Sequence, residues 1–315
     1  MEHIAPVKGG VVANNLAYYE ISAARNLRWR AEVAKAKPSI SLSAKALDIQ
    51  IEKDERFWVV TALMSLFHRP DRVQALAELL GRCLGDALPV DGLNTWEEAL
   101  SGKLCLYFEA HLPSPTSYKT WLAEHLEERI LTPTLLRKTQ LAGKNAEGST
   151  RADAVLVAPD TGFAVVFEAK VLSDVSTSVQ HDVMRNQLSR YIDVLLDRHP
   201  NLDLETLAKR RPERTCLVLL TPEIFRDNPT SRLYGWLMQA YREQPSLLQE
   251  HLPHRKDVDW AAVSRRLGWL TWEDFNRTRR GSVPWLISAT DGQPAGTDTH
   301  DSPVLRPKST DLSCT

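Results

Sequence analysis

The sequence predicts an α/β fold, with a mixed β-sheet flanked by helices. Two observations carry this prediction. Residues 151–158 and 162–170 are β-rich runs, and the segment between them, PDTG (159–162), has the proline and glycine of a tight turn. The apolar period then becomes helical over 178–198, and 215–221 (TCLVLLT) has the pattern of a buried strand. Since a strand, a crossover helix and another apolar strand make a βαβ unit, the last two strands run parallel.

The composition indicates a globular chain. Its 315 residues are enough for one large domain or two smaller ones, and 25% charged and 43% hydrophobic residues are ordinary for a globular protein. No basic region followed by an apolar run opens the sequence, and no apolar stretch approaches the roughly 18 residues of a spanning helix. We therefore expect a cytoplasmic protein with no membrane contact. The four scattered cysteines are expected to be free thiols.

Residues 1–110 are expected to form a helical N-terminal region, because 57–68 and 71–85 carry apolar side chains at helical spacing. Within it, Trp29 stands among basic residues, which form either a solvated helix face or a contact for a nucleic-acid backbone. These residues are Arg25, Arg28, Arg30, Lys35 and Lys37. The chain as a whole has a net charge of −1, so any positive groove for nucleic acid must be local.

A second domain is expected over 111–288, beginning at the break LPSP. It is predicted to open with a helix over 117–129 and a first strand over 132–141, followed by a polar loop that leads into the hairpin. Residues 289–315 are rich in Asp, Thr, Ser, Gly and Pro, which predicts a disordered tail.

Toward the end of the second domain, helices are expected around 229–243 and 258–267. Thr271 is the expected N-cap of a further short helix.

Three ionisable residues meet at one end of the predicted hairpin. With a four-residue loop, Ala158 pairs with Phe163, and counting back along the ladder places Asp153 opposite Glu168. The β-carbons of directly opposed residues in an antiparallel pair lie roughly 4.5–5.5 Å apart. Lys170 follows Glu168 by two residues and therefore points to the same face.

The rest of the hairpin is apolar on both faces, so it belongs at the centre of a layered fold. Two buried carboxylates repel each other unless a cation lies between them, and hard oxygen ligands suit Mg²⁺ or Mn²⁺. A metal held by Asp153 and Glu168 would activate a water and polarise a phosphoryl oxygen, while Lys170 orients the water or stabilises the developing charge. This is the chemistry of phosphodiester hydrolysis.

The arrangement of Asp153 on one strand and Glu168-Ala169-Lys170 on the next resembles the motif of the PD-(D/E)xK nuclease superfamily. Gln187 and Tyr191, four residues apart on the following helix, are similar to the QxxxY element of its RecB-type branch. The sequence departs from the superfamily pattern just before the aspartate, where alanine stands in place of proline.

This resemblance covers about 120–221 and implies a restriction-endonuclease-like αβββαβ core. It implies that Asp153, Glu168 and Lys170 are catalytic, with Asp153 and Glu168 as the metal ligands. Gln187 and Tyr191 would lie near the active site and contact DNA or the metal-bound water.

Some branches of the superfamily add an acid on the first core helix. Glu124 is the candidate here, with Glu127, Glu128 or Glu109 as alternatives. Three other polar residues of the 178–198 segment receive no catalytic role. His181 is expected near a helix N-terminus, and Arg185 and Arg190 are expected to be solvated unless a DNA backbone passes them.

The sequence thus predicts a metal-dependent endonuclease or exonuclease that acts on nucleic acid, most simply DNA, in defence against foreign DNA or in repair by analogy alone. A homodimer or a larger nuclease complex is its expected assembly. The alternatives are an RNA-directed nuclease and a catalytically silent nuclease-fold protein that binds nucleic acid or acts as a scaffold. In the silent case, Asp153, Glu168 and Lys170 form a surface ion-pair cluster, and Gln187 and Tyr191 are a helix-boundary residue and a core tyrosine.

Overall fold

The computed structural model describes residues 54–143, 146–179, 181–199, 202, 205–283 and 286. The predictions for the basic run around Trp29 and for the tail at 289–315 lie outside these residues.

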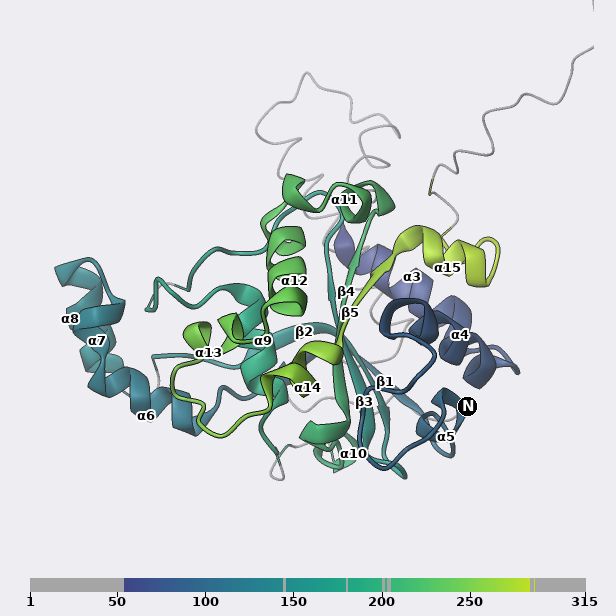
Figure 1. Cartoon of the computed structure of the whole chain (residues 1–315), viewed down its shortest axis with the longest axis horizontal. Helices are drawn as coiled ribbons and strands as arrows, with labels where there is room; N and C mark the ends of the chain where they lie inside the picture. Colours follow the sequence, from purple (N-terminus) through teal and green to yellow (C-terminus); the bar gives the residue numbers. More distant parts are fainter. Residues whose placement is uncertain are drawn as a thin grey trace, which may run out of the picture. The chain divides into compact units, whose positions relative to one another are not determined.

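A five-stranded mixed sheet forms the centre of the fold, with the strands in the order β1-β2-β3-β4-β5 (Figure 1). The first three strands pair antiparallel, and β4 and β5 continue the sheet in parallel. The predicted α/β fold with a mixed sheet is therefore confirmed. The strands are β1 Cys105–Leu112, β2 Thr150–Ala158, β3 Phe163–Ala169, β4 Thr215–Thr221 and β5 Leu267–Thr271.

The predicted hairpin pairing is also confirmed. Ala158 pairs with Phe163, and the ladder continues in register as far as Ala154 opposite Phe167. The turn closes through a hydrogen bond of 2.9 Å from the Gly162 N–H to the carbonyl of Ala158, and Gly162 has a φ of 73°, which only glycine adopts at little cost.

The first strand of the sheet was predicted at the wrong place. Residues 132–141 belong to a helix, α8 (Pro133–Ala142), because Pro133 begins it at a position where proline is tolerated and good helix formers follow. The strand is instead β1, which runs across the domain boundary expected at residue 110. The helix predicted over 117–129 is divided into α6 (Thr116–Glu124) and α7 (Leu126–Arg129). In Figure 1 these two helices and α8 lie together at one side.

Helices cover both faces of the sheet, which gives three layers (Figure 1). On one face, Trp58 contacts Trp272 with ring centroids 5.3 Å apart, and Trp96 contacts Phe163 of β3 at 6.0 Å. The helices of this face are α3 Glu55–Phe67, α4 Arg72–Leu84, α5 Trp96–Ala99 and α15 Trp272–Thr278. The helices of the opposite face are α9 Gln187–Leu195, α12 Leu233–Glu243, α13 Leu247–His251 and α14 Trp260–Arg265.

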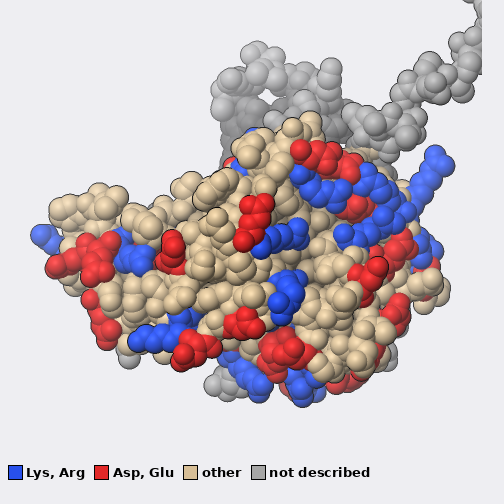
Figure 2. All heavy atoms as spheres, viewed as in Figure 1, with Lys and Arg blue, Asp and Glu red and all other residues tan. Residues whose placement is uncertain are grey.

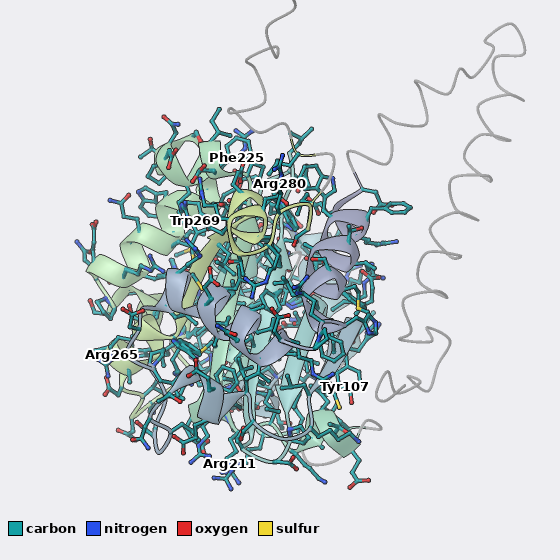
Figure 3. All side chains as sticks on the ribbon, turned by 90° about the vertical axis from the view of Figure 1, so that its right-hand side faces the viewer. Tyr107, Arg211, Phe225, Arg265, Trp269 and Arg280 are labelled. Carbon is teal, nitrogen blue, oxygen red and sulfur yellow. The ribbon has the colours of Figure 1, made fainter. Side chains whose placement is uncertain are left out.

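Short elements complete the described part of the chain. Two of them flank β4, and Figure 3 shows Arg211, just before this strand, and Phe225, just after it, at opposite ends of the sheet. The end near Phe225 is the carboxyl end of the three parallel strands, where ligands bind in open α/β sheets. The remaining elements are α10 Glu205–Ala208, α11 Glu223–Asp227 and the 3₁₀ turns Pro212–Arg214 and Pro229–Ser231.

Local capping explains where two predicted helices begin. The Thr271 hydroxyl accepts a hydrogen bond of 3.2 Å from the Asp274 N–H, and the Asp274 carboxylate accepts one of 2.9 Å in return, so the predicted N-cap is confirmed. The helix predicted over 178–198 begins only at α9, because the Asn186 side chain caps it by accepting from the Ser189 N–H at 2.9 Å.

Three further observations concern the thiols, the lengths of the helices and the surface charges. Cys83, Cys105 and Cys216 are free, as predicted, and the fourth cysteine lies outside the described residues. Within the described ranges, every helix is too short or too polar to cross a membrane. Acidic and basic side chains are interspersed on the face seen in Figure 2.

Candidate functional site

Asp153 and Glu168 occupy the positions next to the last pair of the β2–β3 ladder, Ala154 with Phe167. They share a face with Val155 and Val157 on β2 and with Ala164 and Val166 on β3. These apolar neighbours are buried in the core that includes α9. The alternation of the strands therefore carries both carboxyls to the α9 side of the sheet, at the end where β3 stops.

Glu168 is almost completely buried and receives two short hydrogen bonds. Lys170 Nζ and Gln187 Nε2 each lie 2.6 Å from its Oε1. The lysine is itself only 7% exposed. Burial alone would lower the pKa of Lys170, but the charge of Glu168 outweighs it and raises that pKa, so the side chain is a charged ammonium at neutral pH.

The backbone of Lys170 is fixed from two sides. Its N–H donates to the carbonyl of Leu220 at 2.8 Å, which extends the β3–β4 pairing by one residue. Its carbonyl accepts a hydrogen bond of 3.3 Å from the indole N–H of Trp272. The ammonium is thus held on a rigid element, as a group that acts on a reaction centre needs to be.

Asp153 carries an unfavourable charge. Its Oδ2 accepts a hydrogen bond of 2.8 Å from the Ala169 N–H, whereas its Oδ1 has no hydrogen bond with any described residue. Burial and then the charge of Glu168 raise the pKa of Asp153 well above its ordinary value. A divalent cation between the two carboxyls would offset both effects by favouring the charged form of Asp153, so the oxygen donors present fit a magnesium or manganese ion.

Gln187 and Tyr191 both face this acidic pair from α9. The Gln187 side chain bridges Glu168 and the backbone of Ser176, because its Nε2 donates to Glu168 while its Oε1 accepts from the Ser176 N–H at 3.1 Å. The Tyr191 hydroxyl donates to the carbonyl of Arg151 at 2.8 Å. Burial, followed by the charges of Glu168 and Asp153, raises the pKa of Tyr191. The structure thus brings together all five residues that the sequence singled out.

A third acid near the site, Glu55, was missed. It stands in the first turn of α3, and its Oε1 accepts hydrogen bonds of 3.1 Å from the Val171 N–H and 2.5 Å from the Ser173 hydroxyl. Its charge also acts on Asp153 and Lys170. The available signal was an acidic residue directly before the apolar helical run at 57–68, since acids favour the first turn of a helix.

The residues predicted for this third position lie elsewhere. Glu124, Glu127 and Glu128 line a pocket beside α8, and none of them contacts Glu168 or Lys170. Glu109 is a buried residue of β1 that pairs with Arg56 at 3.3 Å and with Arg151 at 2.8 Å. The helix that carries Glu124 is α6, which follows β1 in the chain, whereas Glu55 lies on α3 before β1.

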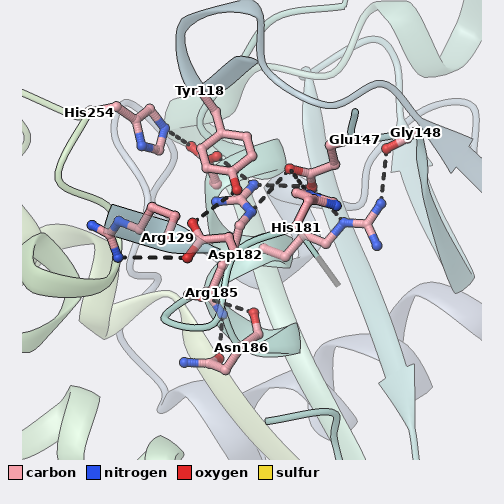
Figure 4. Close-up of polar contacts among 12 residues, drawn as sticks. Tyr118, Arg129, Glu147, Gly148, His181, Asp182, Arg185, Asn186 and His254 are labelled. Atoms are coloured by element: carbon pink, nitrogen blue, oxygen red, sulfur yellow. Dashed lines mark hydrogen bonds and ion pairs between the residues drawn. The ribbon is translucent and has the colours of Figure 1, made fainter. Parts of the chain in front are cut away.

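An ionic cluster lies beside the site, and Figure 4 shows part of it. Arg185, expected in solvent, is only 1% exposed. Its guanidinium lies 2.7 Å from Asp193 Oδ2 and 3.2 Å from Glu147 Oε2, and 3.7 Å from the centre of the Tyr118 ring. Its stem and charge are therefore both enclosed, and the prediction of a solvated arginine was wrong.

Glu147 and Asp193 each bind several cationic groups. Arg190 reaches Glu147 at 2.7 Å and His181 lies 3.6 Å from it, so Arg190 is also held by the protein. His254 and Arg255 contact Asp193 at 2.8 Å and 2.7 Å, and Figure 4 labels His254. Burial alone would raise the pKa of Asp193, but the His254 hydrogen bond and the Arg185 charge lower it to about 2.

The candidate metal centre has two protein carboxylates. Within the described ranges, no three His, Cys, Asp or Glu side chains are grouped so that they could hold a metal ion. Magnesium commonly binds proteins through one or two carboxylates and keeps several waters or substrate phosphates. Asp153 and Glu168 meet this requirement without a third ligand. In comparisons with known proteins, no family model, no curated protein and no solved structure matches the chain.

Proposed function

We propose that this chain is a metal-dependent nuclease of the PD-(D/E)xK type that hydrolyses phosphodiester bonds in DNA. The observation that carries the proposal is the convergence of Asp153, Glu168 and Lys170 at the carboxyl end of β3. Two carboxyls and one ammonium are the groups needed to bind a divalent cation and to act on a phosphate beside it.

The order of the elements supports the same proposal. Helix α3, strands β1, β2 and β3, helix α9 and strand β4 occur in the αβββαβ order that the resemblance implies, with α4 and α5 between α3 and β1. The proposed core thus begins at α3, and the helices α6 to α8 are an insertion between β1 and β2.

Each residue of the site has a distinct proposed role. Asp153 and Glu168 would hold Mg²⁺ or Mn²⁺, which when bound acidifies water and polarises the phosphate. Lys170 supplies a fixed positive charge toward the reacting phosphate, since its raised pKa keeps it protonated. Gln187, on α9, donates a 2.6 Å hydrogen bond to the Glu168 carboxylate and is a positioning residue.

The test is cleavage of linear, circular and single-stranded DNA, and of RNA, with Mg²⁺ or Mn²⁺ and with EDTA. We expect metal-dependent cleavage of DNA. The Lys170→Met variant should lose about 10²- to 10³-fold in rate, the usual effect of removing one positioned charge donor. Lys209→Met is the matched control, because Lys209 also pairs with one glutamate, Glu205 at 3.5 Å, but is exposed.

The outcomes separate the proposal from its rivals. Equal cleavage by wild type, Lys170→Met and Asp153→Ala would refute the assigned site. Cleavage of RNA alone would assign the other nucleic acid to the same chemistry. Binding of DNA without cleavage under any metal would favour a binding or scaffolding module.

A further inference from the structure

A second cavity adjoins the acidic site. It is a pocket of 560 Å³, and Gln187 and Tyr191 belong to its lining as well as to the candidate site. Its other walls come from the segment that leads into β2, from the loop before α9, and from Arg190 on α9. Because Gln187 contacts Glu168 directly, the pocket lies one side chain away from the proposed metal centre.

The lining has the chemistry of an anion site. Ser149, Thr150, Ser176 and Ser178 belong to its lining, Arg151 and Arg190 supply positive charge, and none of the described lining residues is an aspartate or glutamate. The Thr150 hydroxyl is buried and has no hydrogen-bond partner among the described residues.

The two arginines differ in how they are held. Arg190 is committed to the protein, since it pairs with Glu147 at 2.7 Å and its Nη2 donates to the carbonyl of Gly148 at 2.9 Å. Arg151 has a side chain that is 47% exposed, and its Nη2 lies 2.8 Å from Glu109 Oε2. A guanidinium has five N–H donors in a planar fork, and because about half of this side chain is exposed, a ligand can reach it.

We propose that this pocket binds one nucleotide unit of the DNA strand through its phosphate, with Arg151 as the phosphate-binding side chain. The inference rests on the proposed nuclease function and adds a subsite for the nucleotide that adjoins the bond to be cut. Arginine favours phosphate through two parallel charge-assisted hydrogen bonds, and a pocket of this size admits a nucleotide. Tyr191 links the subsite to the site, because its hydroxyl fixes the backbone of Arg151.

The test is calorimetric binding of deoxyadenosine 5′-monophosphate to the full chain in EDTA, compared with deoxyadenosine and inorganic phosphate. We expect the nucleotide to bind, and to bind at least tenfold more tightly than either fragment. Arg151→Gln should weaken this binding about tenfold, the value of one charge-assisted contact. Arg198→Gln is the matched control, because Arg198 is an exposed arginine paired with one carboxylate, Glu213 at 3.4 Å, and should bind like wild type.

Metal-free binding keeps this inference separate from the proposed cleavage. Asp153→Asn should retain nucleotide binding, since the pocket does not include Asp153. No binding by wild type, equal affinity for inorganic phosphate and nucleotide, or an unchanged Arg151→Gln variant would each overturn the subsite. Cleavage that persists with such results would leave the nuclease proposal standing, and binding without cleavage would leave only the subsite.

Discussion

Replacing Asp153 by asparagine should stabilise the metal-free protein, although it removes a group of the proposed active site. The Ala169 N–H donates to one carboxyl oxygen of Asp153, and an asparagine Oδ1 can accept the same hydrogen bond. The amide nitrogen of the asparagine then takes the place of the other carboxylate oxygen of Asp153. It presents N–H donors instead of a second negative charge near Glu168. The native arrangement therefore includes a repulsion that the variant lacks.

The size of the effect follows from Coulomb's law. Two ionised carboxylates about 5 Å apart, the general spacing of directly opposed residues in an antiparallel pair, repel by about 3 kcal/mol at an effective dielectric constant of roughly 20. Lys170, 2.6 Å from Glu168, offsets most of this repulsion. A net gain on the order of 1 kcal/mol remains, which corresponds to a rise in Tm of roughly 2–4 °C for a domain of this size.

The difference in stability between Asp153→Asn and wild type should reverse its sign when metal is added. A cation that binds only the folded state stabilises it by about 2.7 kcal/mol at a hundred times its Kd. Wild type should gain this increment in Mg²⁺ or Mn²⁺, and Asp153→Asn should not. Thermal unfolding of both proteins, in EDTA and in a metal titration, measures the two effects. A variant that is less stable than wild type in EDTA, or that gains equally from metal, would refute the electrostatic reasoning.

Four further expectations follow from the same contacts. Metal affinity should fall as the pH drops through the raised pKa of Asp153, because the protonated carboxyl must lose its proton to bind; a Mn²⁺ titration at several pH values tests this. The pKa of Asp193 is lowered from 3.8 to about 2, which contributes roughly 2 kcal/mol to the free energy of unfolding. This contribution is present above about pH 4 and is lost as the pH falls toward 2. Acid unfolding of Asp193→Asn should lack this loss. Arg185→Met should cost about 3–5 kcal/mol in urea unfolding, against less than about 0.5 kcal/mol for the exposed control Arg82→Met. Asn186→Ala should cost about 1 kcal/mol through the lost helix cap and slow cleavage by loosening the start of α9, and a stability loss with unchanged cleavage would contradict the second part.

The hairpin was predictable because its chemistry is local. A proline and a glycine in a four-residue loop fix the register, and the register alone places Asp153 opposite Glu168. Gln187 follows from helical spacing, although the start of its helix does not. Asn186 has the side chain of an N-cap, but the apolar period continues on both sides of it and conceals the boundary.

The elements that depend on distant contacts were not predictable in the same way. β1 is an ordinary apolar run, and its place at the edge of the sheet depends on pairing with residues about 45 positions later in the chain, such as Leu112 with Thr150 at the near end. Glu55 reaches the site because α3 packs against the sheet, with hydrogen bonds to Val171 and Ser173. The sequence around β1 does not show its partner strand, and the sequence around Glu55 does not show Val171 and Ser173.

The buried ionic cluster explains how the two halves of the site keep their relative position. Glu147 lies six residues before Asp153 on the segment that leads into β2, and Asp193 lies on α9, six residues after Gln187. Arg185 binds both acids, so one guanidinium joins the approach to β2 to the helix that faces it. Buried ion pairs contribute little net stability compared with apolar packing, but they allow few alternative geometries. We infer that the cluster fixes the separation between the Asp153 carboxyl and the Gln187 amide, on which both the proposed metal centre and the adjoining nucleotide subsite depend.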